Sequence, residues 1–296
     1  MRLLWLVEIP LPWTPWGVET LVNIGVVISS IFLGALYLHQ DKLIYMASLP
    51  AGSREVVANP GDAGMGDDWD SVSLRTEDGV AITGYAIYTR ATPQEDNGNT
   101  LRNRTDKKGP VAKYTLLYCH ANAGNMGHRL PIARILRLKS TVNVFMLSYR
   151  GYGKSQGSAS EKGIKVDAQA ALDWIASHEV LGSTKVILYG QSIGGAVAID
   201  LASRNPDRVA AVIVENTFLS LPKLVPTVMP MLKHLVPFLL HQIWDSEKAI
   251  QGIPASVPML FLSGGKDELI PQRHMIELAK VTRRARQASF PEGDKS

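Results

Sequence analysis

The segment Gly190-Gln191-Ser192-Ile193-Gly194 constrains this 296-residue chain more than any other segment does. It follows the apolar run 185–189, which predicts a strand, and it opens the Ala-containing stretch 193–204, which predicts a helix. A serine on a sharp turn from strand to helix needs small neighbours, and the two glycines supply them. The helix would point its free N–H groups and its positive dipole end at the serine oxygen. We therefore predict that Ser192 is a nucleophile.

Short apolar runs alternate with helical stretches along much of the chain. We expect strands at 114–119, 142–148, 185–189, 209–214 and 259–263, and helices over about 127–139, 161–178, 193–204 and 271–284. Ahead of them, alternating residues on both sides of Asp78-Gly79 predict an antiparallel hairpin. Continuous apolar strands separated by helices are typical of a mostly parallel sheet with helices on both faces. Together with the serine turn, this order predicts the α/β-hydrolase fold.

Two backbone N–H groups are candidates to stabilise the oxyanion that attack by Ser192 would create. One belongs to Ile193, the first residue after the nucleophile. The other belongs to Asn122, because hydrolases of this fold take their second donor from the loop after the corresponding strand. His120 stands in the same loop but ahead of the nucleophile, whereas the base follows the nucleophile in this fold. We expect His120 to brace the loop.

Two other segments are expected at the carboxyl edge of the sheet. The Gly-containing stretch 148–155 follows a strand, and Arg150 within it either braces loops or contacts substrate. Residues 219–244 carry several prolines among apolar residues and lie between two predicted strands, where a lid would cover the site. This small apolar lid insertion either binds an acyl chain or forms a packing pair of helices.

Asp267 is the candidate catalytic acid. It follows the apolar strand 259–263 through Gly264-Gly265-Lys266, and this fold places there the acid that orients the imidazole. The alternative is that Asp267 caps the following helix, and Glu268 is the nearest competing carboxylate.

No catalytic histidine is found after Asp267 in the place where this fold needs one. One more helix fits 271–284 and one more strand fits 286–290, but residues 291–296 contain no histidine. His274 lies in the first turn of the predicted helix, and we expect a solvated side chain rather than a base. Without a base, a serine hydroxyl is a weak nucleophile.

Residues 21–38 are apolar and uncharged. At about 1.5 Å per residue, a helix of this length nearly spans a hydrocarbon core of roughly 30 Å. We predict a single-pass membrane anchor at 21–38 after an N-terminal segment 1–20; a cleaved signal peptide and a buried core helix are the alternatives. Flanking charges do not decide its orientation. The glycosylation sequon at Asn103 mildly favours the lumen, so the endoplasmic reticulum or another endomembrane is the expected location.

The composition limits the partners and cofactors that are expected. A formal net charge of +4 gives no case for nucleic acid binding. No metal-ligand spacing is present, and no cofactor is expected. The single cysteine, Cys119, ends an apolar run, so we expect a buried structural thiol. A connector over 39–68 precedes one hydrolase domain over 69–296, in which 91–112 is a polar loop.

Four segments resemble the membrane-anchored eukaryotic α/β-hydrolases of the bud-emergence type. They are CHANAGNMGHRL, SYRGYGKSQGSASEKG, the run from LYGQSIGG to FLSLPKL, and LFLSGGKDELIP. The resemblance covers about residues 70–296. It implies a membrane anchor, a Ser-Asp-His triad with Ser192 and Asp267 as two members, and hydrolysis of ester or thioester bonds.

The chain departs from this family at two places. Ala121 stands where the family usually has glycine, so we expect its methyl group to narrow the oxyanion loop. Gly293-Asp294-Lys295 stands where the family has its Gly-x-His. The resemblance therefore implies that the C-terminal part of the fold is missing here. A truncated or mis-spliced gene sequence is the first explanation, and a genuine pseudoenzyme is the second.

These observations predict a membrane-anchored serine hydrolase that acts on an acyl ester or thioester of a lipid or an acylated protein, with the triad histidine absent from this chain. Two alternatives stay open. One is a catalytically dead binding or scaffold protein with this fold, and the other is a serine peptidase of the same fold.

Overall fold

A computed structural model describes residues 15–90 and 111–289. The sequon at Asn103, most of the polar loop 91–112 and the Gly293–Lys295 segment lie outside the described residues. Seven strands form one sheet in the order β1-β2-β4-β3-β5-β6-β7. The strands are β1 (Trp69–Arg75), β2 (Ala81–Ile87), β3 (Tyr114–Cys119), β4 (Asn143–Ser148), β5 (Lys185–Gln191), β6 (Val209–Glu215) and β7 (Met259–Leu262).

The sheet is parallel over its larger part. β1 pairs antiparallel with β2 around the Asp78-Gly79 turn, and β2 pairs antiparallel with β4. The remaining neighbours all pair parallel, from β4 through β3, β5 and β6 to β7. The predicted hairpin and the predicted mostly parallel sheet are both confirmed.

Helices connect the parallel strands, as the alternating pattern predicts. The α-helices are α1 (Pro15–Ile44), α2 (Leu130–Ser140), α3 (Glu161–Ser177), α4 (Ile193–Arg204), α5 (Leu221–Val228), α6 (Val236–Leu239), α7 (Ser246–Ala249) and α8 (Arg273–Ser289). Short 3₁₀ turns are η1 (Met126–Arg129), η2 (Leu181–Ser183), η3 (Pro206–Arg208), η4 (Pro230–Leu232) and η5 (Ile250–Gly252).

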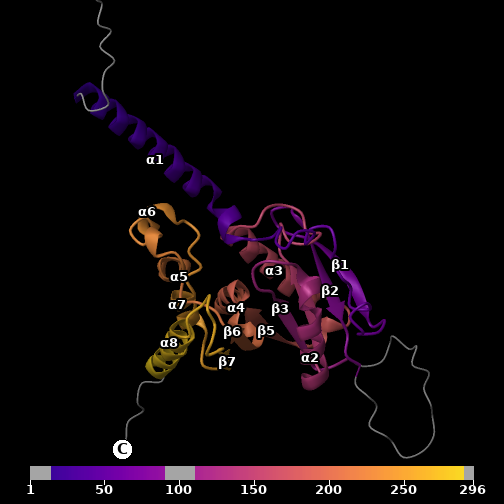
Figure 1. Cartoon of the computed structure of the whole chain (residues 1–296). Coiled ribbons are helices and arrows are strands. Elements are labelled where there is room, and N and C mark those ends of the chain that lie inside the picture. The colour runs from indigo at the N-terminus through magenta and orange to yellow at the C-terminus, as the bar shows by residue number, and fades with distance from the viewer. Residues whose placement is uncertain (1–14, 91–110, 290–296) are drawn as a thin grey trace, which may run out of the picture.

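The two faces of the sheet are buried by different helices. Alternate residues of β3 illustrate this: Leu117 and Cys119 pack in the core shared with α3 and α4, whereas Leu116 and Tyr118 pack in the core shared with α2. Every residue of β4 is buried, as expected for a strand covered on both faces. Helices therefore lie on both faces of the sheet centre, as predicted (Figure 1).

The sheet is less well covered by helices at β7, its edge strand in the described part of the chain. Leu260 of β7 is 52% exposed, although it is apolar and belongs to a sheet. The strand predicted at 286–290 does not form: α8 continues to Ser289. Ala285 and Arg286 follow Leu278 by seven and eight residues, a spacing that puts them on the same face of a helix. The Arg286 guanidinium donates to the Val257 carbonyl and so holds the last turns of α8 in place. That interpretation was wrong because Ala, Arg and Gln favour helix.

The apolar N-terminal stretch is one long helix, α1, which is longer than the predicted 21–38. Gly17–Ile44 spans 28 residues, and none of its most apolar window is buried in the protein. At about 1.5 Å per residue it is about 42 Å long, enough by length and composition to cross a membrane. The buried-core interpretation is therefore wrong. α1 bends at His39, which has non-helical angles (φ −117°, ψ 15°).

After this bend the chain packs against the hydrolase domain, whereas α1 ahead of it projects away (Figure 1). Gln40 is buried and donates through Nε2 to the Leu239 carbonyl at 2.9 Å. The Gln40 side-chain oxygen accepts from the His241 N–H at 3.0 Å. Tyr45 donates to Gln242 at 2.9 Å. The end of α1 is thus joined to the distal part of segment 219–244.

Candidate active site

Ser192 occupies the turn between β5 and α4. Its backbone has φ 55° and ψ −121°, a conformation that residues with a Cβ rarely adopt. Its N–H donates to the Glu215 carbonyl at 2.9 Å, and its carbonyl accepts from the Thr217 hydroxyl at 2.7 Å. Contacts from the end of β6 therefore hold Ser192 in the strained geometry that a nucleophile turn requires.

The glycines of the turn are required by close approach of backbone to backbone. A Cβ on Gly190 would lie 2.1 Å from the Gly194 carbonyl oxygen. A Cβ on Gly194 would lie 2.0 Å from the Cys119 carbonyl oxygen. Larger residues cannot fit at either place, so the spacing around Ser192 follows from packing as well as from chain conformation.

The two predicted oxyanion donors belong to chain segments that leave neighbouring strands, β5 and β3, at the same edge of the sheet. Ile193 is the first residue of α4, and the first N–H groups of a helix have no intrahelical acceptor. Cys119 of β3 lies opposite Gly190 of β5 in the sheet register. The loop after β3, which contains Asn122, therefore leaves the sheet next to the turn of Ser192. The roles of the two N–H groups stay predictions.

The side chain of Asn122 joins this loop to the end of α1. Its Oδ1 accepts from the Met46 N–H at 3.0 Å and from the Tyr152 hydroxyl at 2.6 Å. Its Nδ2 donates to the carbonyl of Ile44. No sequence pattern indicates the contacts with Met46 and Ile44, because these residues lie 76 and 78 positions from Asn122 along the chain.

His120 is fully buried behind the same loop. Its Nδ1 donates to the Ala121 carbonyl at 2.8 Å, and its ring packs against Tyr149 and Tyr152 with centroids 4.2 and 5.0 Å away. Burial lowers the pKa of His120 to about 4, so the ring is neutral near neutral pH. These contacts support the bracing role. Cys119 is buried too, as predicted, and burial raises its pKa to about 12.

Arg150 also acts as a brace. Its guanidinium lies 2.7 Å from Asp78 of the β1–β2 turn and 2.8 Å from the buried Asp167 of α3. Its backbone N–H donates to Asp167 at 2.7 Å. A Cβ on Gly163 would lie 2.4 Å from the Arg150 side chain, so α3 needs a glycine there. All these contacts are internal, which favours bracing over substrate contact.

Asp267 lies beyond the carboxyl end of β7. Its Oδ1 accepts from the N–H groups of Leu269 and Ile270, both at 2.9 Å. It therefore caps the turn before α8 and not α8 itself, which begins at Arg273. Neighbouring strands lie about 4.8 Å apart, so β7 is about 10 Å from β5 across β6. Among residues 15–90 and 111–289, no hydrogen bond joins Asp267 to Ser192.

All seven histidines of the chain fall within the described ranges, and none bonds to Ser192 or Asp267. His274 is buried, so the expectation of a solvated side chain was wrong. Its Nδ1 accepts from the Leu219 N–H at 3.4 Å, and burial lowers its pKa. The neighbouring Met275 receives the Thr217 N–H on its sulfur, so the first turn of α8 packs against the chain that follows β6. His274 is therefore buried by contacts with a distant part of the chain, and the residues next to it in sequence gave no indication of this burial.

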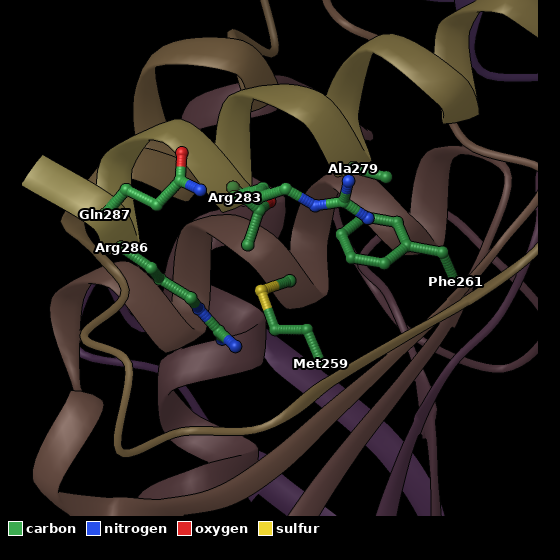
Figure 2. A pocket seen from close by; sticks show the side chains of 7 residues that line it. Met259, Phe261, Ala279, Arg283, Arg286 and Gln287 are labelled. Atoms are coloured by element: carbon green, nitrogen blue, oxygen red, sulfur yellow. The ribbon is translucent and has the colours of Figure 1, made fainter.

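A surface hollow lies between β7 and the second half of α8, lined by Met259 and Phe261 on one side and by Arg283 and Arg286 on the other (Figure 2). Met259 is the first residue of β7, whereas Ser192 and Asp267 follow the carboxyl ends of their strands. The hollow is therefore on the flank of the sheet, away from the candidate triad, and we do not assign it to substrate.

No cluster of three His, Cys, Asp or Glu side chains in residues 15–90 and 111–289 is arranged to hold a metal ion.

Comparison with known proteins identifies the same kind of domain. Residues 114–243 match the family described as alpha/beta hydrolase fold. Protein bem46 of Schizosaccharomyces pombe is 42% identical over 266 residues, which cover 89% of this chain and 82% of that protein. The membrane protein YNL320W of Saccharomyces cerevisiae is 35% identical over 264 residues, which cover 89% of this chain and 84% of that protein.

A solved structure shares the fold. The esterase Pf2001 of Pyrococcus furiosus aligns with a TM-score of 0.56 at 20% identity, over 78% of this chain and 82% of that one. At this identity the likeness concerns the fold alone.

Proposed function

Because the chain belongs to the alpha/beta hydrolase fold family, we propose that it is a membrane-anchored serine hydrolase of acyl esters or thioesters. One observation carries the proposal: Ser192 is held at φ 55° between a strand and a helix, and close backbone contacts require glycine at positions 190 and 194. Strain of this kind is kept where function uses it. An esterase among the structural neighbours is consistent with the reaction type.

The proposed reaction has two steps. The Ser192 Oγ attacks the carbonyl carbon of the acyl group while its proton moves to a base. The N–H groups of Ile193 and Asn122 stabilise the oxyanion of the tetrahedral intermediate. The C–O or C–S bond then breaks, the alcohol or thiol leaves with the proton, and water hydrolyses the acyl-enzyme. Asp267 orients the base through the carboxylate oxygen that the 267–270 turn does not use.

The membrane part of the proposal is supported by α1 and by the Saccharomyces cerevisiae relative YNL320W, which is described as a membrane protein. We propose a single-pass anchor in the endoplasmic reticulum or another endomembrane, with substrates carried on lipids or acylated proteins. We propose the domain limits as the sequence predicts them: an N-terminal segment 1–20, an anchor at 21–38, a connector at 39–68 and a hydrolase domain over 69–296.

The base is the missing element of the proposed triad. None of the seven histidines contacts Ser192 or Asp267, and Lys295 occupies the sequence position of the family histidine. Loss of one triad member typically costs about 10⁴-fold or more in rate, with residual turnover from the oxyanion hole. One alternative function therefore stays open, a binding or scaffold protein that keeps the fold without turnover.

A fluorophosphonate probe tests the proposal on the full chain in lipid nanodiscs. We expect slow labelling of Ser192, faster labelling when free imidazole is added, and no labelling of Ser192→Ala. Lys295→His in the same chain is the matched gain-of-function variant, and we expect it to label faster than its parent. Failure of imidazole and of Lys295→His to increase labelling would favour the scaffold function. Assays of p-nitrophenyl esters against aminoacyl amides separate ester hydrolysis from peptidase activity.

A further inference from the structure

The segment between β6 and α7 exposes large apolar side chains at its outer end. We define the lid tip as Val228, Met229, Met231 and Phe238, from α5, η4 and α6. Met231 is 83% exposed and Phe238 is 82% exposed, so neither side chain packs in the core. Four large apolar side chains gathered in one short segment mark an interaction surface rather than scattered exposure.

The charged side chains of the lid segment are cationic. Between Asn216 and Trp244 the sequence contains no Asp or Glu. Lys233 and His234 are exposed next to the lid tip, whereas the other lysine of the segment, Lys223, pairs with Glu247 of α7. Exposed apolar side chains with an exposed lysine beside them match the chemistry of an anionic lipid surface.

The position of the lid tip relative to α1 favours the same partner. α6 contacts α1 directly, and Gln40 bonds to Leu239 and to His241 just after the bend at His39. The ring of Tyr37 lies 5.0 Å from the ring of His241. Aromatic residues often mark the membrane interface at the end of a spanning helix. Figure 1 shows α5 and α6 at the base of the projecting helix α1.

We infer that the lid tip inserts into the interfacial layer of the leaflet from which α1 emerges, as a second membrane contact. This inference depends on the membrane anchor of the proposed function. The lid tip supplies the apolar side chains, and Lys233 beside it supplies a cation for the headgroups.

Site-directed spin labelling of the full chain tests the inference in nanodiscs of phosphatidylcholine and phosphatidylglycerol. The chain is suited to it, because its single cysteine, Cys119, is fully buried. Met231→Cys and Phe238→Cys place labels on the lid tip at positions too exposed to disturb the core. Ser183→Cys, exposed on η2, is the water-facing control, and Ile28→Cys in α1 is the lipid-facing control.

We expect labels at 231 and 238 to collide more with oxygen than with a water-soluble nickel chelate, as the label at 28 does and the label at 183 does not. Water-like accessibility at 231 and 238, together with lipid-like accessibility at 28, overturns the lid contact and leaves the anchor in place. Water-like accessibility at 28 overturns the anchor and the lid contact together.

Discussion

The backbone N–H of Met46, two residues beyond α1, donates a hydrogen bond of 3.0 Å to the side chain of Asn122, whose own N–H is the expected second oxyanion donor. One amide side chain therefore contacts both the end of α1 and the loop beside Ser192. Asn122 Oδ1 also accepts from the Tyr152 hydroxyl and from the Ala123 N–H. The conformation of the oxyanion loop is thus coupled to the docking of α1.

Substitution of Asn122 tests this coupling. We expect Asn122→Ala to lower the free energy of unfolding by about 2 kcal/mol, because four exposed or partly buried hydrogen bonds are lost at about 0.5 kcal/mol each. Hydrogen exchange should rise at 44–49 and at 120–125 together. The control is Tyr152→Phe, which removes one bond; we expect a loss of about 1 kcal/mol and unchanged exchange at 44–49. Unchanged exchange at 44–49 in Asn122→Ala would refute the coupling.

Backbone strain at Ser192 predicts an unusual order of stability. We expect Ser192→Gly to be more stable than Ser192→Ala by about 1 kcal/mol in urea unfolding, since glycine adopts φ 55° without cost. Ser203, an ordinary helical position in α4, is the matched control. There, Ser203→Gly should be less stable than Ser203→Ala by about 1 kcal/mol. The same order at both sites would contradict the strain.

The two carboxylates on Arg150 should contribute unequally. Asp167 is fully buried, whereas the Asp78 side chain is 45% exposed. The Arg150 guanidinium holds the pKa of Asp78 below its usual range, while burial raises the pKa of Asp167. Asp167→Ala leaves a buried charge without its main partner, and we expect a loss of about 3–5 kcal/mol.

Asp78→Ala is the comparison for that variant, and we expect it to cost about 1 kcal/mol, because solvent screens its exposed pair. Thermal or urea unfolding measures both. Equal losses of unfolding free energy would show that the difference in burial between Asp167 and Asp78 does not control their contributions to stability.

His120 makes stability depend on pH. Its pKa falls from 6.5 in the unfolded chain to about 4 in the folded chain, so the unfolded chain binds the extra proton between these values. Stability is therefore fully present above about pH 6.5 and declines as the pH falls toward 4. From pH 7 to pH 5 we expect a loss of about 2 kcal/mol from this group.

His120→Phe keeps an aromatic ring against Tyr149 and Tyr152 but cannot titrate. We expect its unfolding free energy to fall less between pH 7 and pH 5 than that of the unmodified chain. Parallel pH profiles for the two proteins would assign the acid sensitivity to other groups, of which buried His274 shifts in the same direction.

Much of the central fold could be predicted, because strand and helix periods are local properties of the chain. The predicted helix at 193–204 coincides with α4, and the predicted strand at 259–263 differs from β7 by one residue. The wrong strand at the C-terminal end had a local cause, because Ala, Arg and Gln favour helix, and a tertiary contact adds to it. The strand expected at 286–290 is the continuation of α8, where Arg286 bonds to Val257 from the preceding loop.

The candidate site divides in the same way. Ser192 could be recognised because strand, glycines and helix are adjacent in sequence. Contacts between residues far apart in sequence could not be recognised. Asn122 lies 78 and 76 positions from Ile44 and Met46, and Gln40 lies 199 positions from Leu239. His274 was misjudged for the same reason: its burial comes from the loop after β6, which approaches α8 only in the folded chain.

The bend at His39 and the bonds of Gln40 have a kinetic consequence. A domain on a loose tether would turn freely and would meet substrate from the surrounding volume. With α1 spanning a membrane, as we propose, this joint would limit both the tilt of the domain and its height over the membrane surface. Turnover should then follow the mole fraction of substrate within the lipid plane, and diluting the vesicles at constant lipid composition should leave it unchanged.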